Sequence, residues 1–178
     1  VFKTTDGGKT WKAMGLEDTE PIARIQVDPE DSDTVCECAT GHLWDAHEER
    51  GVFKTTDGGQ SWTKVETLPS EPMARPGLSV AQSSPNVVYL LTEFPTAGTV
   101  FRSEDYGETW RMVNDDRNVN FRPFYYSDVV VDPTNPDHLY TLSGRLSKST
   151  DGGKTFERIA QDVHGDHQSY WIDPENSN

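Results

Sequence analysis

The chain has 178 residues, of which 30 are acidic and 16 are basic, so its formal net charge is −14. This charge argues against nucleic acid as a partner, because phosphate backbones are bound through clusters of lysine and arginine. No apolar run approaches the ~20 residues that a membrane-spanning helix needs, and we predict no membrane span.

An eight-residue phrase occurs four times along the chain. The copies are TTDGGKTW at 4–11, TTDGGQSW at 55–62, SEDYGETW at 103–110 and STDGGKTF at 149–156. Their spacing of about fifty residues indicates a series of similar supersecondary units. The phrases are flanked by short apolar or alternating stretches, which is the pattern of a β-hairpin.

A second pattern precedes each complete hairpin. Apolar runs flank a turn rich in proline, aspartate, asparagine and serine at 24–40, 78–93 and 128–144, and the same pattern begins again at 170–178. Together the two patterns predict four antiparallel strands per unit, repeated radially, which describes a β-propeller blade. A stacked β-solenoid is the alternative, although its repeats are usually shorter.

The predicted fold is therefore all-β, a partial propeller of about four blades. Its divisions are 1–16 for the end of a first blade, 22–68, 77–114 and 126–160 for three complete blades, and 167–178 for the start of a fifth. We interpret the chain as an excerpt whose open blade edges would meet the rest of a larger propeller or lead to self-association. The alternative is a closed four-bladed ring in which the last strand completes the first blade.

Residues that all four phrases share are expected to stabilise the hairpin rather than to bind a ligand. The aspartate can accept local backbone hydrogen bonds, the glycine can adopt the positive φ of a tight turn, and the aromatic ring can fill the space between sheets. These residues are Asp6, Gly8, Trp11, Asp57, Gly59, Trp62, Asp105, Gly107, Trp110, Asp151, Gly153 and Phe156.

The phrase resembles the Asp-box, or BNR repeat, of sialidases, of xyloglucan-degrading glycoside hydrolases and of sortilin-type (VPS10) propellers. Four segments are more similar to bacterial sortilin-like BNR propellers: ARIQVDP at 23–29, GHLWDAHEERGVFKTTDGG at 41–59, RPFYYSDVVVDP at 122–133 and HGDHQSYWIDPENSN at 164–178. The resemblance covers nearly the whole chain and implies the propeller fold and an extracellular or periplasmic location. It is specific for the fold and weak for function, because binding proteins and enzymes share the Asp-box.

Three segments interrupt the repeat and hold the candidate functional residues. In 41–50, which also carries His42, Trp44 could stack on a sugar or peptide while carboxylates such as Asp45 hydrogen-bond to it; the alternative is a loop anchored by its tryptophan. In 114–126, Arg122 and Tyr125 suit an anionic or sugar ligand, whereas the phenylalanines suit packing between blades.

The third segment, 164–171, offers His164, Asp166 and His167 as weak metal ligands. Two imidazoles and one carboxylate leave the coordination incomplete unless another blade contributes. The alternative is a hydrogen-bonded loop, and we predict no cofactor.

One repeated position of the innermost strands carries different side chains. Arg24, Asp128 and Ser169 each lie four residues before the aspartate of an Asp-Pro dipeptide. In a propeller this position is close to the central axis, so the variation indicates a varied cleft rather than a shared core. Arg24 and Asp128 therefore join the candidate ligand-binding residues.

Two functions from different classes are consistent with the sequence. The first is a sortilin-like binding or interaction module for a peptide or a polysaccharide. The second is part of an exo-acting glycoside hydrolase, sialidase-like or xyloglucanase-like, which needs two carboxylates flanking the scissile bond. Because nothing in the sequence singles out such a pair, no catalytic residue is assigned and the binding function is favoured.

Overall fold

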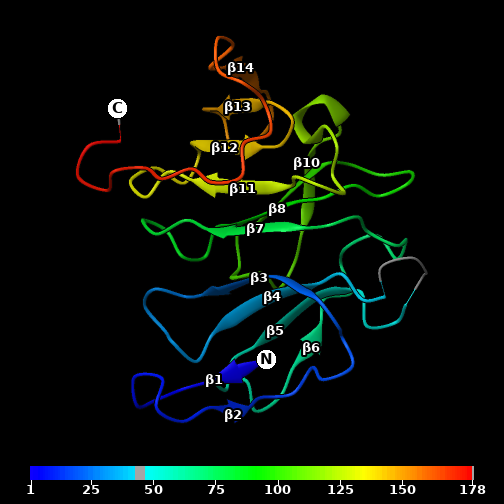
Figure 1. The fold of residues 1–178 in the computed structure, drawn as a ribbon, viewed down its shortest axis with the longest axis vertical. Coiled ribbons are helices and arrows are strands. Elements are labelled where there is room, and N and C mark those ends of the chain that lie inside the picture. The colour runs from blue at the N-terminus through cyan, green and yellow to red at the C-terminus, as the bar shows by residue number, and fades with distance from the viewer. Residues whose placement is uncertain (43–46, 178) are drawn as a thin grey trace.

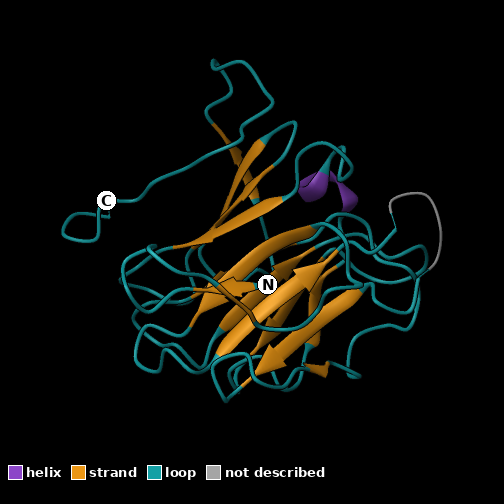
Figure 2. Cartoon of the chain, turned by 60° about the horizontal axis from the view of Figure 1, so that its bottom comes forward, coloured by secondary structure: helices purple, strands orange, loops and turns teal. Residues whose placement is uncertain are grey.

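The computed structural model describes residues 1–42 and 47–177, and nearly all of its regular structure is β-strand (Figures 1 and 2). The described part of the chain contains no helix that is long and apolar enough to cross a membrane. Within residues 1–42 and 47–177 the single helical element is the 3-10 turn η1 (Arg117–Asn120), which Asp116 caps by accepting a hydrogen bond from the backbone of Asn118.

The strands form four antiparallel sheets in chain order. Sheet 1 contains β1 (Phe2–Lys3) and β2 (Lys12–Ala13). Sheet 2 contains β3 (Ile22–Val27), β4 (Val35–Ala39), β5 (Gly51–Thr55) and β6 (Thr63–Lys64). Sheet 3 contains β7 (Gly77–Val80), β8 (Val88–Leu91), β9 (Val100–Ser103) and β10 (Arg111–Asn114). Sheet 4 contains β11 (Asp128–Val131), β12 (Leu139–Leu142), β13 (Leu146–Ser149) and β14 (Glu157–Ile159).

Each of sheets 2, 3 and 4 has its strands in sequential order, as a propeller blade does. The all-β fold of four-stranded antiparallel blades predicted from the repeat is confirmed. The first strands of these sheets, β3, β7 and β11, lie next to one another in Figure 1.

The segment 168–173 differs from the strand that the sequence predicts there, because the structure assigns it no strand. Its side chains instead pack on sheet 4: the Tyr170 ring lies 4.8 Å from that of Tyr140, and Ile172 contacts the cluster that contains Leu142 and Leu146. A strand needs a hydrogen-bonded neighbour, whereas here side-chain packing holds the segment.

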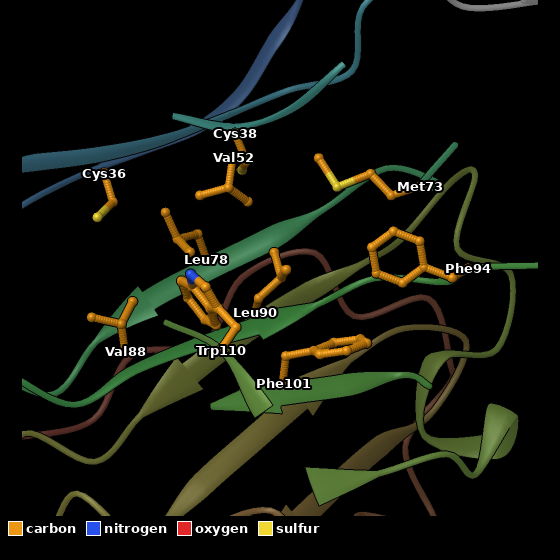
Figure 3. Close-up of a cluster of buried hydrophobic side chains, with 10 residues drawn as sticks. All are labelled: Cys36, Cys38, Val52, Met73, Leu78, Val88, Leu90, Phe94, Phe101 and Trp110. Carbon is orange, nitrogen blue, oxygen red and sulfur yellow. The ribbon is translucent and has the colours of Figure 1, made fainter. Parts of the chain in front are cut away.

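Apolar clusters join the consecutive sheets. Between sheets 2 and 3, Cys36, Cys38 and Val52 face Leu78 and Trp110, and both cysteines are free thiols (Figure 3). A second cluster joins sheets 3 and 4. Burying these side chains, at roughly 25 cal/mol per Å² of apolar surface, provides the driving force for stacking the sheets.

The innermost strands approach one another closely at Gly77. A Cβ atom at this position would lie 2.7 Å from the Cα of Asp128, so only glycine fits between β7 and β11. Two positions further along, the Oγ of Ser79 accepts a hydrogen bond from the backbone of Val131 at 3.2 Å. Both ends of β11, at Asp128 and at Val131, are therefore held against β7.

Candidate functional site

The connections of sheets 2 to 4 gather on two opposite faces. In a four-stranded antiparallel meander, the turns after the first and third strands lie on one side, and the other connections lie on the opposite side. We call the second side the loop face; it contains the described parts of the connections, at 40–42, 47–50, 65–76, 92–99, 115–127, 143–145 and 160–169. The Asp-box hairpins lie on the other side, which we call the turn face.

A hollow of about 410 Å³ opens on the loop face, and we call it the inner hollow. Its walls come from the segments that lead into the three innermost strands, namely Pro21–Ala23 before and within β3, Met73–Arg75 before β7, and Pro123–Phe124 before β11. Arg50 and Glu93 add charged groups to this largely apolar lining. Apolar walls with a few polar groups are typical of a ligand site.

Arg75 is an exposed side chain at this hollow. Its Nη1 donates a hydrogen bond to the carbonyl oxygen of Tyr125 at 3.2 Å. Tyr125 is 64% exposed, and its ring meets that of Phe124 edge to face at 5.3 Å. The predicted candidate Tyr125 therefore lies next to the hollow, together with Arg75, which the repeat comparison did not select.

Arg122 and Arg145 lie over one aromatic ring. Their guanidinium carbons are 5.6 and 5.3 Å from the centre of the Phe121 ring, respectively. Arg122 has a φ of +69°, and its carbonyl oxygen accepts hydrogen bonds from the backbones of Tyr125 and Tyr126. The segment 121–126 is thus a compact turn that presents Phe121, Phe124 and Tyr125 to solvent.

Arg24 and Asp128 meet each other rather than facing an open cleft. Two guanidinium nitrogens of Arg24, Nε and Nη2, donate to the two oxygens of Asp128, which lies 104 positions later in the chain. This hydrogen bonding raises the pKa of Arg24. The ion pair connects sheets 2 and 4 across Gly77, so both predicted ligand-binding side chains are engaged within the protein.

The loop at 41–50 is described only at its ends. Trp44 and Asp45 lie outside the described residues. The ring of His42 stacks on that of His47 at 4.0 Å, and its Nε2 lies 3.4 Å from Glu20 Oε1. A second hollow beside them, of about 670 Å³, is lined by these histidines and by Glu17, Asp18, Glu20, Glu48 and Glu49.

His164, Asp166 and His167 lie on the loop that follows sheet 4. Gly165 packs against the carbonyl of Gly144, and the backbone of His167 donates to Ser143 at 3.2 Å. Among residues 1–42 and 47–177, no group of three or more His, Cys, Asp or Glu side chains is arranged to hold a metal ion. The metal interpretation gains no support from this arrangement.

The four Asp-boxes have the same local hydrogen bonds. At Asp151, Oδ1 accepts from the backbone of Thr155 at 2.9 Å and Oδ2 accepts from its hydroxyl at 2.6 Å, while Ser149 donates to Oδ1 at 2.8 Å. The other three boxes repeat this network around Asp6, Asp57 and Asp105. Partial burial raises the pKa of Asp151, but the hydrogen bonds outweigh it and lower the pKa to about 2.

The Asp-boxes of sheets 2, 3 and 4 also contact the first turn of their own sheet and the sheet that precedes it. Gly58, Tyr106 and Gly152 donate to the carbonyls of Asp33, Asn86 and Asp137 in the first turn of their own sheets. The aromatic residue packs on the preceding sheet: Trp62 Nε1 donates to Met14 O at 2.6 Å, and Trp110 joins Cys36 and Val52. Trp11 belongs to sheet 1 and is 61% exposed.

A series of ion pairs between sheets was not foreseen. Lys3 pairs with Asp33 at 3.4 Å, Lys54 with Glu108 at 2.8 Å and Arg102 with Asp137 at 2.5 Å, each reaching from one sheet to the next. The sequence carries a signal for the basic partner, because a lysine or arginine stands three residues before each Asp-box aspartate, Lys148 included. Two of the acidic partners, Asp33 and Asp137, also share a repeated position, five residues after the aspartate of an Asp-Pro dipeptide, whereas Glu108 lies within an Asp-box.

Comparison with known proteins is consistent with this architecture. The family model of the BNR/Asp-box repeat matches residues 2–13. Photosystem II assembly lipoprotein Ycf48 of Synechococcus sp. (strain CC9902) is 30% identical over 117 residues, which are 62% of this chain and 29% of that protein. The chain therefore spans less than a third of this curated relative.

Solved structures share the fold at low sequence identity. The GH74 xyloglucanase from Xanthomonas campestris has a TM-score of 0.69 at 21% identity, covering 93% of this chain and 28% of its own. An ancestral GH74 enzyme has a TM-score of 0.67 at 22% identity, and the match covers 91% of this chain and 21% of the enzyme's chain. The structure of Ycf48 bound to D1 peptide has a TM-score of 0.61 at 17% identity, and the match covers 84% of this chain and 44% of the Ycf48 chain.

Proposed function

We propose that this BNR-type β-propeller chain is a binding module that holds a peptide on its loop face, in the inner hollow. The observation that carries the proposal is the hollow itself, which three consecutive sheets build at the start of their inner strands. Its apolar walls, with Arg75 and Phe124 beside exposed Tyr125, offer both an apolar contact and a hydrogen-bond donor. Such a combination suits an extended ligand with mixed side chains.

A peptide is favoured over a polysaccharide as the ligand class. One structure with the same fold is that of Ycf48 bound to D1 peptide. The polysaccharide alternative would use the exposed Phe121, Phe124 and Tyr125 rings as stacking platforms. We also propose that the chain is sortilin-like, because the segments 23–29, 41–59, 122–133 and 164–178 resemble bacterial sortilin-like propellers.

The enzyme alternative is a glycoside hydrolase, since GH74 enzymes share the fold. Such an enzyme needs one carboxyl group to protonate the leaving group and another free to attack or to activate water. At the inner hollow, Glu93 is paired with Arg117 at 3.3 Å, and nearby Asp128 is paired with Arg24. Since both carboxylates are held by arginines, binding is favoured over hydrolysis.

The proposal is tested on a peptide array with Phe124→Ala as the site variant and Tyr106→Ala as its control. Both residues are exposed aromatics, and Tyr106 lies in an Asp-box on the turn face. We expect Phe124→Ala to weaken peptide binding about tenfold, whereas Tyr106→Ala leaves it unchanged. Release of sugars from xyloglucan without peptide binding would instead establish the hydrolase alternative and overturn the proposal.

We also propose an extracellular or periplasmic location. The resemblance to exported sortilin-like propellers supports it, and the curated relative is a lipoprotein. Fractionation of cells that express the complete gene product would test the location, and recovery in the cytosolic fraction would contradict it.

A further inference from the structure

Among the residues that the structure describes, three arginines on the loop face have no acidic partner, although the chain carries far more acidic than basic residues. Arg24, Arg102, Arg111 and Arg117 are each paired with a carboxylate. Within the described ranges, by contrast, no carboxylate lies within ion-pair distance of Arg75, Arg122 or Arg145; their contacts are to a carbonyl oxygen and an aromatic ring. Arg158 likewise has no ion pair among the described residues, but Arg75, Arg122 and Arg145 are distinguished by their grouping around the single turn 121–126.

The three guanidinium groups are positioned by the same turn. Arg122 and Arg145 share the Phe121 ring, and Gly144 donates its backbone N–H to the carbonyl of Phe121 at 3.2 Å. Arg75 donates to Tyr125, whose own N–H donates to Arg122 O at 3.1 Å. A planar guanidinium stacked on a ring keeps its in-plane N–H donors available for a carboxylate.

The apolar part of the surface is adjacent to these cations. Arg75 and Phe124 line the same hollow, together with Ile22, Ala23 and Met73. A ligand that placed an apolar side chain in the hollow would therefore bring its neighbouring groups to Arg75 and to the turn 121–126. Since Arg75 and the arginines at this turn are positively charged, negatively charged groups of the ligand would be favoured there.

We propose that the ligand of the loop face is a peptide in which carboxylates flank an apolar side chain. The apolar side chain enters the inner hollow, and the carboxylates bind Arg75 and the Arg122–Arg145 pair. This inference rests on the proposed function and narrows its ligand class. The surface as a whole repels such a peptide, but at physiological salt charges are screened beyond about 8 Å, so the local arginines dominate at contact.

The test uses three fluorescein-labelled decapeptides, which are Glu-Phe, Gln-Phe and Lys-Phe repeats, and an oligogalacturonate of similar charge. We expect the Glu-Phe peptide to bind at least about tenfold more tightly than the Gln-Phe peptide. The double variant Arg122→Gln, Arg145→Gln should lose this preference, and the Lys pair at the same positions should keep part of it. Arg158→Gln is the matched control, since Arg158 is exposed on β14, the outermost strand of sheet 4, and does not line the hollow, and it should leave the preference unchanged.

The outcomes separate this inference from the proposed function. Equal binding of the Glu-Phe and Gln-Phe peptides, or loss of the preference in Arg158→Gln, would overturn the acidic preference while peptide binding stands. Binding of none of the peptides would overturn the proposed function. Oligogalacturonate binding that depends on Arg122 and Arg145, without peptide binding, would replace the peptide with an acidic polysaccharide and overturn both. Thermal unfolding of each variant establishes that lost binding is not lost folding.

Discussion

At the scale of single residues, Glu37 in the middle of β4 is the least expected side chain. It is paired across the strands with Ile25 and Phe53, is 0% exposed, and neither carboxyl oxygen has a hydrogen-bond partner. Burial raises its pKa to about 8, although the Val1 amino group lowers it somewhat. Glu37 is therefore mostly protonated at neutral pH, because an unpaired buried carboxylate is costly.

Glu37→Gln should remove one component of the pH dependence of stability. The unfolded chain loses the Glu37 proton near its ordinary pKa of 4.5 and the folded chain near 8. Between these values the folded state binds more protons, so the free energy of unfolding falls as pH rises, by up to about 1.4 kcal/mol per unit. Urea unfolding at pH 5, 6.5 and 8 should show the difference between variant and parent growing with pH, while exposed Glu157→Gln gives a constant difference. The prediction would be contradicted if the free energies of unfolding of Glu37→Gln and of the parent changed with pH in parallel.

At the scale of elements, the Asp-box hairpin is stabilised by one aspartate that accepts from several donors. The pKa of Asp151 is lowered to about 2 because the folded hairpin bonds to the ionised form. Its contribution to stability is therefore present above pH 4 and is lost as the pH falls toward 2. The same sign holds for Asp6, Asp57 and Asp105, whose pKa values are also lowered.

Asp151→Ala should lower the free energy of unfolding by about 1 kcal/mol at pH 7, because backbone donors lose their partner. The effect should shrink as the pH falls below 4. Asp162→Ala is the control, since Asp162 is exposed in the turn that follows β14, and peptide binding should survive in both variants. Loss of binding with unchanged stability would show that the Asp-box aspartate serves the ligand instead of the hairpin.

The local elements could be predicted from the sequence, whereas the contacts between sheets could not. The Asp-boxes are read from eight consecutive residues, because their hydrogen bonds join positions such as Ser149, Asp151 and Thr155. The pairing of Arg24 with Asp128 and of Lys54 with Glu108 joins residues 104 and 54 positions apart. Which side chains meet there depends on the stacking of whole sheets, so the sequence indicated Arg24 and Asp128 as variable positions but not as partners.

At the scale of the whole molecule, the Arg24–Asp128 pair should couple sheets 2 and 4. A double-mutant cycle with Arg24→Met and Asp128→Asn should give a coupling energy of about 1 kcal/mol, reduced by partial exposure. The exposed pair Arg111–Glu104, which lies within sheet 3, should give a coupling near zero in the same cycle. Equal coupling energies for the two pairs, measured by chemical denaturation, would show that the inner pair contributes no more than a surface contact.

The Asp-box aromatics of sheets 2, 3 and 4, namely Trp62, Trp110 and Phe156, each pack on the sheet that precedes their own in the chain. Trp62 packs on Met14, and Trp110 packs on Cys36 and Val52, so the aromatic residue of each of these hairpins docks on residues that were synthesised before it. Repeat proteins gain much of their stability from such nearest-neighbour interfaces. On the ribosome, the aromatic residue of each emerging hairpin would therefore find its docking surface already synthesised, whereas ion pairs such as Lys54–Glu108 would form only once the next sheet follows.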